Sequence, residues 1–133
     1  MTGAIIMSLW IIISISGCRK APTIWGTWGE SSLVRVLSTN GAETFSDTTY
    51  YSGGGGTTFT FTTAGTYFST FSNGKYTLSN KTLTLLDTTN TPNQTFQFAV
   101  LTLNHNILIL QHNDTSALSP LTTAQYTYVC VPE

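Results

Sequence analysis

The sequence predicts an all-β domain of antiparallel strands, and its composition and its hydropathy pattern carry that prediction. The chain contains 26 threonines and 13 serines among 133 residues, and 12% of its residues are aromatic. Threonine and aromatic side chains suit a pleated, half-buried surface, whereas the Glu, Lys, Ala and Arg of helical surfaces are scarce. Beyond the first segment, apolar residues recur with a period of two and not at helical spacing.

Turn signals at short intervals divide this alternation into nine segments that we expect to be strands. Asn40-Gly41 and the four glycines at 53–56 adopt positive φ at little cost, and Asn73-Gly74 is expected to form another turn. Connections this short favour hairpins over βαβ units. The expected strands are 27–37, 43–51, 57–63, 66–71, 75–79, 81–87, 95–103, 106–112 and 124–131.

Length and charge limit what the domain can be. A chain of 133 residues with 41% hydrophobic residues predicts one domain with one modest core. Five basic and six acidic residues give a net charge of -1, which leaves no basic surface for nucleic acid. We therefore expect no nucleic-acid partner, and we favour a monomer.

Residues 1–17 form a separate segment, because every charged residue lies beyond Cys18. As a helix, the apolar stretch 4–16 would span about 20 Å, whereas a transmembrane helix needs about 20 residues. Such a stretch is typical of the hydrophobic region of a signal peptide, and the alternative is a buried N-terminal strand. Met1-Thr2-Gly3 lacks the Lys or Arg that usually precedes this region, which favours a natural start further upstream.

The apolar stretch ends in Ile15-Ser16-Gly17-Cys18, which resembles the lipobox of bacterial lipoproteins. The resemblance implies that residues 1–17 are removed, that Cys18 is acylated, and that residues 18–24 are a tether. Two or more acyl chains anchor a protein stably to a membrane. The residues after Cys18 lack the acidic stretch that resembles surface-export signals of Bacteroidota lipoproteins. We therefore expect a position in the cell envelope that faces the periplasm.

Cys130 is the second of two cysteines and lies in the last expected strand. If Cys18 is acylated, Cys130 has no partner and we expect a buried free thiol that packs as a small hydrophobe. A disulfide between Cys18 and Cys130, in an oxidising compartment where the chain ends meet, is the competing account.

Three stretches of residues 25–133 resemble the lipocalin-like domains of small bacterial lipoproteins, which are most frequent in Bacteroidota. Gly26-Thr27-Trp28 matches the Gly-x-Trp opening of that family, and residues 59–67 and 74–85 resemble its two central hairpins. Ala64 and Asn80 depart from the turn residues of the family. The resemblance implies an antiparallel up-and-down barrel of about eight strands, whose interior can hold one small ligand.

Alternation assigns one apolar face to every expected strand, with a bulge between Phe98 and Leu101. The residues of this face either fill the barrel as a solid core or surround a ligand. An empty apolar space above about 300 Å³ would favour a ligand. The candidate ligand-lining or core residues are Trp28, Phe59, Phe61, Tyr67, Tyr76, Leu78, Phe96, Phe98, Leu108, Leu110, Tyr126 and Tyr128.

Residues suited to catalysis or metal binding are few. His105 and His112 are seven residues apart, at opposite ends of one expected strand, so they do not converge on one zinc ion. Asp47, Asp87 and Asp114 lie beside turn residues. We therefore expect no enzyme, no metal and no cofactor. The sequence predicts a membrane-tethered protein that binds a small apolar ligand, or alternatively a tethered structural or protein-interaction module with a solid barrel.

Overall fold

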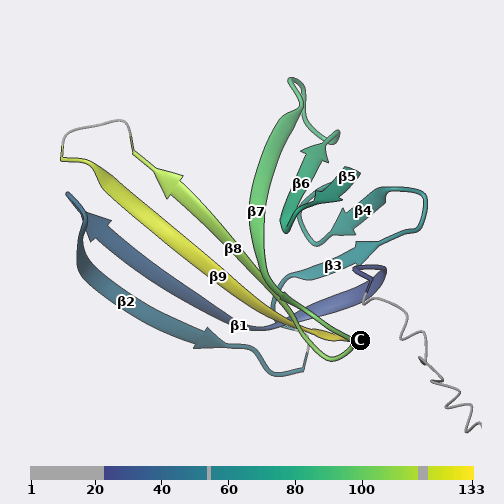
Figure 1. Cartoon of the computed structure of the whole chain (residues 1–133), viewed down its shortest axis with the longest axis horizontal. Helices are drawn as coiled ribbons and strands as arrows, with labels where there is room; N and C mark the ends of the chain where they lie inside the picture. The colour runs from purple at the N-terminus through teal and green to yellow at the C-terminus, as the bar shows by residue number, and fades with distance from the viewer. Residues whose placement is uncertain (1–22, 54, 117–119) are drawn as a thin grey trace, which may run out of the picture.

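The computed structural model describes residues 23–53, 55–116 and 120–133, and their regular structure consists of nine β-strands (Figure 1). Each strand matches one of the nine predicted segments, with ends that differ by at most three residues. Within the described ranges, no helix has the length and apolar character needed to span a membrane. The expected signal peptide and Cys18 lie outside these ranges. The strands are β1 (Gly26–Thr39), β2 (Ala42–Tyr50), β3 (Thr58–Phe61), β4 (Thr66–Ser69), β5 (Asn73–Ser79), β6 (Thr82–Asp87), β7 (Gln94–Leu103), β8 (Leu108–Thr115) and β9 (Thr122–Pro132).

The strands close an antiparallel barrel. β1 pairs with β3, each strand from β3 to β8 pairs with the next, and β9 pairs with β1 again. This circuit contains eight strands, and β2 is a ninth strand that pairs with β1 outside it. The structure thus confirms the expected all-β barrel with up-and-down order.

Three strands of the barrel continue beyond it. Residues 26–29 of β1 pair with β3, whereas residues 32–39 pair with β2, and the β7–β8 pairing reaches no further along β8 than Gln111. Residues 32–39, 112–115 and 122–128 therefore form, with β2, a four-stranded sheet that we call the arm. Figure 1 shows the arm as a single layer on the left, with β3 to β7 on the right.

The barrel has two ends, which we call the base and the mouth. The base is formed by residues 23–26 and by the turns at 62–65, 80–81 and 104–107, because Gly26 pairs with Phe61 and the strands alternate in direction. The mouth is formed by the turn at 70–72 and the loop at 88–93, beside the start of the arm.

Two of the expected turns have different outcomes. Asn40 and Gly41 adopt positive φ of 51° and 81° between β1 and β2, as expected for a tight hairpin turn. The turn expected at Asn73-Gly74 was wrong, because both residues belong to β5 and the chain turns at 70–72. A Cβ atom on Gly74 would lie 1.9 Å from the carbonyl oxygen of Leu86. This glycine therefore permits close strand approach and does not form a turn.

The expected faces are confirmed along most of the barrel. Phe59 and Phe61 are buried while Thr60 between them is partly exposed, and the expected bulge lies between Val100 and Thr102. Leu78 differs from the expectation, because it lies at the base with 38% of its surface exposed. At the open end of a barrel, a side chain on the inner face is not covered by further residues, so it stays exposed to solvent.

Candidate functional site

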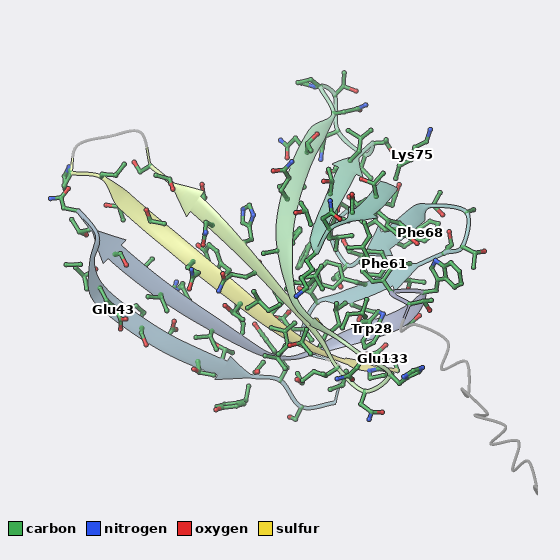
Figure 2. The ribbon with its side chains drawn as sticks, viewed as in Figure 1. Trp28, Glu43, Phe61, Phe68, Lys75 and Glu133 are labelled. Carbon is green, nitrogen blue, oxygen red and sulfur yellow. The ribbon has the colours of Figure 1, made fainter. Side chains whose placement is uncertain are left out.

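The middle of the barrel is a solid core. Phe61, Tyr67, Leu83, Leu108 and Leu110 are each at most 2% exposed. Figure 2 shows Phe61 pointing into the space that strands β3 to β7 enclose. At this level the apolar face is therefore core, and no ligand cavity runs through the barrel.

An open pocket of about 260 Å³ lies at the mouth, where the barrel meets the arm, and we call it the mouth pocket. Ligand pockets of drug-sized molecules typically measure about 300–1,000 Å³. The mouth pocket is smaller, so it fits a single ring system or a short chain. Its walls are formed by Thr57, Phe59, Ser69, Phe71, Ser72, Leu85, Phe96, Phe98, His112 and Tyr128.

Aromatic contacts hold the walls of the mouth pocket in place. The ring of Tyr128 meets Phe98 at a centroid distance of 5.9 Å and an angle of 72°. It meets Phe59 at 6.4 Å and 88°. Such edge-to-face pairs are favourable beyond the area that they bury. Since β9, β7 and β3 supply these rings, the wall is braced across the barrel and is preformed for a flat apolar ligand.

His112 lines both the mouth pocket and a neighbouring open pocket of about 490 Å³. Its Nδ1 lies 2.8 Å from the carbonyl oxygen of Gln97, and a carbonyl oxygen can only accept. Nδ1 therefore carries a proton, and in the neutral ring Nε2 is left as an acceptor. The imidazole also packs against Phe98, with 5.3 Å between ring centroids, so its orientation is fixed.

Tyr128 also lines the mouth pocket. Burial raises the pKa of its hydroxyl above the ordinary value, and the negative charge of Glu30 raises it further. The hydroxyl is therefore protonated at neutral pH, and among the described residues it has no hydrogen-bond partner. The mouth pocket therefore carries one imidazole and one phenol side chain among its aromatic and apolar lining residues.

The turn that carries Phe71 is fixed by hydroxyl groups. The Tyr67 hydroxyl lies 3.0 Å from Oγ of Ser72, and Oγ of Ser69 donates to the carbonyl oxygen of Ser72 at 3.0 Å. Phe71 itself is largely exposed at the pocket rim. The core thus anchors the turn, while the aromatic ring at its tip remains accessible to a ligand.

Glu30 is a buried carboxylate that joins β1 to the segment before β3. Its Oε2 accepts the backbone N–H of Thr57 at 2.7 Å, whereas Oε1 has no partner among the described residues. On the neighbouring strand lies Cys130, which is fully buried and free, as expected. Burial and the charge of Glu30 raise the pKa of this thiol to about 12. Cys130 is therefore neutral and unsuited to act as a nucleophile.

The predicted residues separate into three groups. Phe59, Phe96, Phe98 and Tyr128 line the mouth pocket. Tyr126 lies on the arm, where it lines a shallow pocket of about 200 Å³ beside the ion pair of Arg35 and Asp47. The remaining residues, which lie in the core, against it or at the base, are Trp28, Phe61, Tyr67, Tyr76, Leu78, Leu108 and Leu110.

The candidate residues left out six that line the mouth pocket, which are Thr57, Ser69, Phe71, Ser72, Leu85 and His112. Phe71 ends an expected strand, and nothing in the local pattern shows that its ring turns toward the mouth. The alternation that places Leu108 and Leu110 on the inner face extends to His112, so this signal was present in the sequence. His112 is half-buried.

In the part of the chain that the structure describes, no three or more His, Cys, Asp or Glu side chains gather into a group that could hold a metal ion. No protein-family model, no curated protein and no solved structure matches this chain. Fold and site define a small antiparallel β-barrel with a solid middle and an aromatic pocket open at one end.

Proposed function

We propose that this chain is a membrane-anchored, lipocalin-like lipoprotein that binds a small apolar ligand in the mouth pocket. The observation that supports binding is the combination of an aromatic wall with two side chains that carry polar groups, His112 and Tyr128, in the lining of one pocket. Apolar walls supply affinity, and a few placed polar groups fix orientation. The volume of about 260 Å³ favours a ligand of one or two rings that carries at most one polar group.

The anchor in this proposal is Cys18, acylated at the start of a short tether and held in the cell envelope on the periplasmic side. Support comes from the charge-free apolar segment that ends in Ile15-Ser16-Gly17. Acyl chains on one cysteine would hold the barrel at the membrane without a transmembrane helix.

An alternative function is a tethered structural or protein-interaction module. The solid middle of the barrel favours it, and so do Phe45 and Tyr50, which are exposed along β2 at the edge of the arm. An unpaired edge strand offers backbone groups to another chain. In that case the mouth pocket would bind no small apolar molecule.

Titration with 2-naphthol, an uncharged fluorescent dye with one fused two-ring system and one hydroxyl group, tests the binding proposal. We expect saturable binding to the wild-type protein. Thr57→Phe should fill the pocket, because the Thr57 side chain lines it and makes no hydrogen bond of its own. We expect a loss of affinity of about tenfold or more, which corresponds to about 1.4 kcal/mol.

Thr84→Phe is the matched control, since Thr84 lies on the outer face of β6 between the buried Leu83 and Leu85. This variant should bind the dye as the wild type does. Denaturation midpoints of both variants near the wild-type value would exclude unfolding as the cause. No saturable binding to the wild type, or equal binding by all three proteins, would contradict the pocket proposal and favour the interaction module.

Membrane fractionation of Cys18→Ser tests the anchor separately. We expect the variant to leave the membrane fraction and to lose the mass change that acylation and signal cleavage give the wild type. A variant that stayed with the membrane, with the same mass as the wild type apart from the substitution, would contradict acylation at Cys18.

A further inference from the structure

The base of the barrel carries exposed apolar side chains. Trp25 is 47% exposed and Leu78 is 38% exposed, and the two residues line one open pocket of about 340 Å³. Lys81 is exposed in the adjoining turn between β5 and β6. A tryptophan, a leucine and a lysine at one end of a domain match the side chains that settle at the boundary between water and lipid.

The described chain begins at this same end. Ile24 is buried, and its carbonyl oxygen accepts a hydrogen bond of 2.8 Å from Nε1 of Trp28, so the backbone is fixed to the core from this residue onward. Six Cα steps separate Cys18 from Ile24. Fully extended, they span at most about 22 Å. An acylated Cys18 would therefore hold the base within that distance of the headgroups.

We propose that the base of the barrel rests on the membrane surface, with the side chains of Trp25 and Leu78 among the lipid headgroups. The inference rests on the acylation of Cys18 in the proposed function. Anchored on such a short tether, these two side chains meet the lipid surface at high local concentration, so even weak apolar contacts suffice.

Apolar contact is the contribution that the base of the barrel itself makes to this docking. Lys81 would attract anionic lipid, but Glu133 is exposed at the same end and lines a second pocket there with Trp25 and His105. These two charges offset one another at the base, while Arg19 and Lys20 in the tether add positive charge beside the headgroups, so anionic lipid should strengthen the docking and salt should weaken that added attraction. Because the mouth is the opposite end of the barrel, the mouth pocket faces the water and a ligand reaches it without crossing lipid.

Quenching of tryptophan fluorescence by brominated lipid tests the docking. The acylated wild-type protein, purified from membranes, is reconstituted into phosphatidylcholine vesicles whose acyl chains carry bromine near the headgroups. The mature chain from Cys18 has two tryptophans, Trp25 at the base and the buried Trp28. We expect the bromine to quench most of the Trp25 emission, and Trp25→Phe should abolish the quenching.

Leu78→Ser should weaken the quenching of Trp25. Phe68→Ser, which removes an even more exposed apolar side chain from the outer face of β4, should leave it unchanged. A vesicle-bound protein whose Trp25 is not quenched would overturn the docking and leave the anchor intact. A Cys18→Ser protein that remained in the membrane fraction would overturn the anchor itself. Equal quenching in Leu78→Ser and the wild type would show that the base does not insert through this pocket.

Discussion

The barrel and the arm are built largely from the same strands, yet they bury their side chains very differently. On β1 and β9, Trp28 and Cys130 are buried in the barrel part, whereas residues 32–39 and 122–128 in the arm are all only partly buried. The barrel closes on itself, so each inward side chain faces an opposite wall, and the arm is a single layer. The alternation of apolar and polar residues therefore produces a core only where the sheet closes.

The largest loss of stability is expected when a buried side chain of β3 is removed. Phe61→Ala should destabilise the protein by about 3–5 kcal/mol, through lost transfer free energy and a residual cavity. Thr60→Ala, one residue away on the outer face, should cost about 1 kcal/mol or less, since it loses only the contact between its Oγ1 and that of Thr27. Denaturant midpoints measure both. Equal midpoints would refute the face assignment on which the barrel core depends.

A matched pair of leucines compares the two regions directly. Leu110→Ala removes a fully buried side chain in the barrel and should cost about 2–5 kcal/mol. Leu37→Ala removes the same atoms from the partly buried arm and should cost about 1 kcal/mol or less. Unfolding by urea checks the difference. A cost at Leu37 as large as that at Leu110 would mean that the arm is packed against a second layer.

Cys130 lies in the buried barrel part of β9, so the free energy of unfolding should depend on pH through its thiol. Burial raises the pKa of its thiol from 9.0 to about 12 in the folded protein. A raised pKa favours the folded state fully below pH 9, and this advantage is lost as the pH rises toward 12. By about pH 10 the wild type should therefore lose about 1–2 kcal/mol relative to Cys130→Ala.

Denaturation midpoints of both proteins from neutral to alkaline pH measure this loss. A thiol reagent at pH 8 provides an independent check, because the buried thiol should react only after unfolding. Rapid reaction in the native protein would show that the barrel opens near Cys130.

The smallest loss of stability is expected when an ion pair on the arm is broken. Arg35 donates from Nε and a terminal nitrogen to the two carboxylate oxygens of Asp47, at 3.2 and 3.3 Å, and its guanidinium lies over the ring of Phe45. Both charged side chains are about 40% exposed, so the pair is screened by solvent. Asp47→Asn should change stability by about 0.5 kcal/mol or less, and added salt should reduce that change. A cost of several kcal/mol in urea unfolding would contradict an open arm.

Local patterns were enough to predict the strands and the faces of the barrel. Phe59 and Phe61 alternate with threonines, and Asn40-Gly41 marks a tight hairpin, so these features depend on neighbours in sequence. β2 lies outside the barrel because β1 pairs with β3 in its first part and with β2 in its second part. The sequence of β2 does not contain that information. The alternation of β2 alone is compatible with either place.

The mouth pocket was only partly predictable for the same reason. Its walls combine residues of β3, β4, β6, β7, β8 and β9 and of the turn at 70–72. They lie at the height where β7 and β8 separate, and that height follows from barrel closure. His112 could have been placed by extending the alternation of β8, whereas the exposure of Leu78 depends on the distance to the rim. The prediction for Gly74 was wrong for a different reason. The glycine was interpreted as part of a turn, whereas close packing of β5 against β6 requires a glycine there.

The central claim is that a small ligand binds where the solid barrel opens toward the arm. Titration of the isotope-labelled protein with indole, followed by amide chemical shifts, tests it most directly. We expect saturable shifts at Phe96, His112 and Tyr128 around the mouth pocket, and none at Leu83 in the core or Arg35 on the arm. Shifts confined to β2 and residues 32–39 of β1, or no saturable shift at any residue, would contradict the claim.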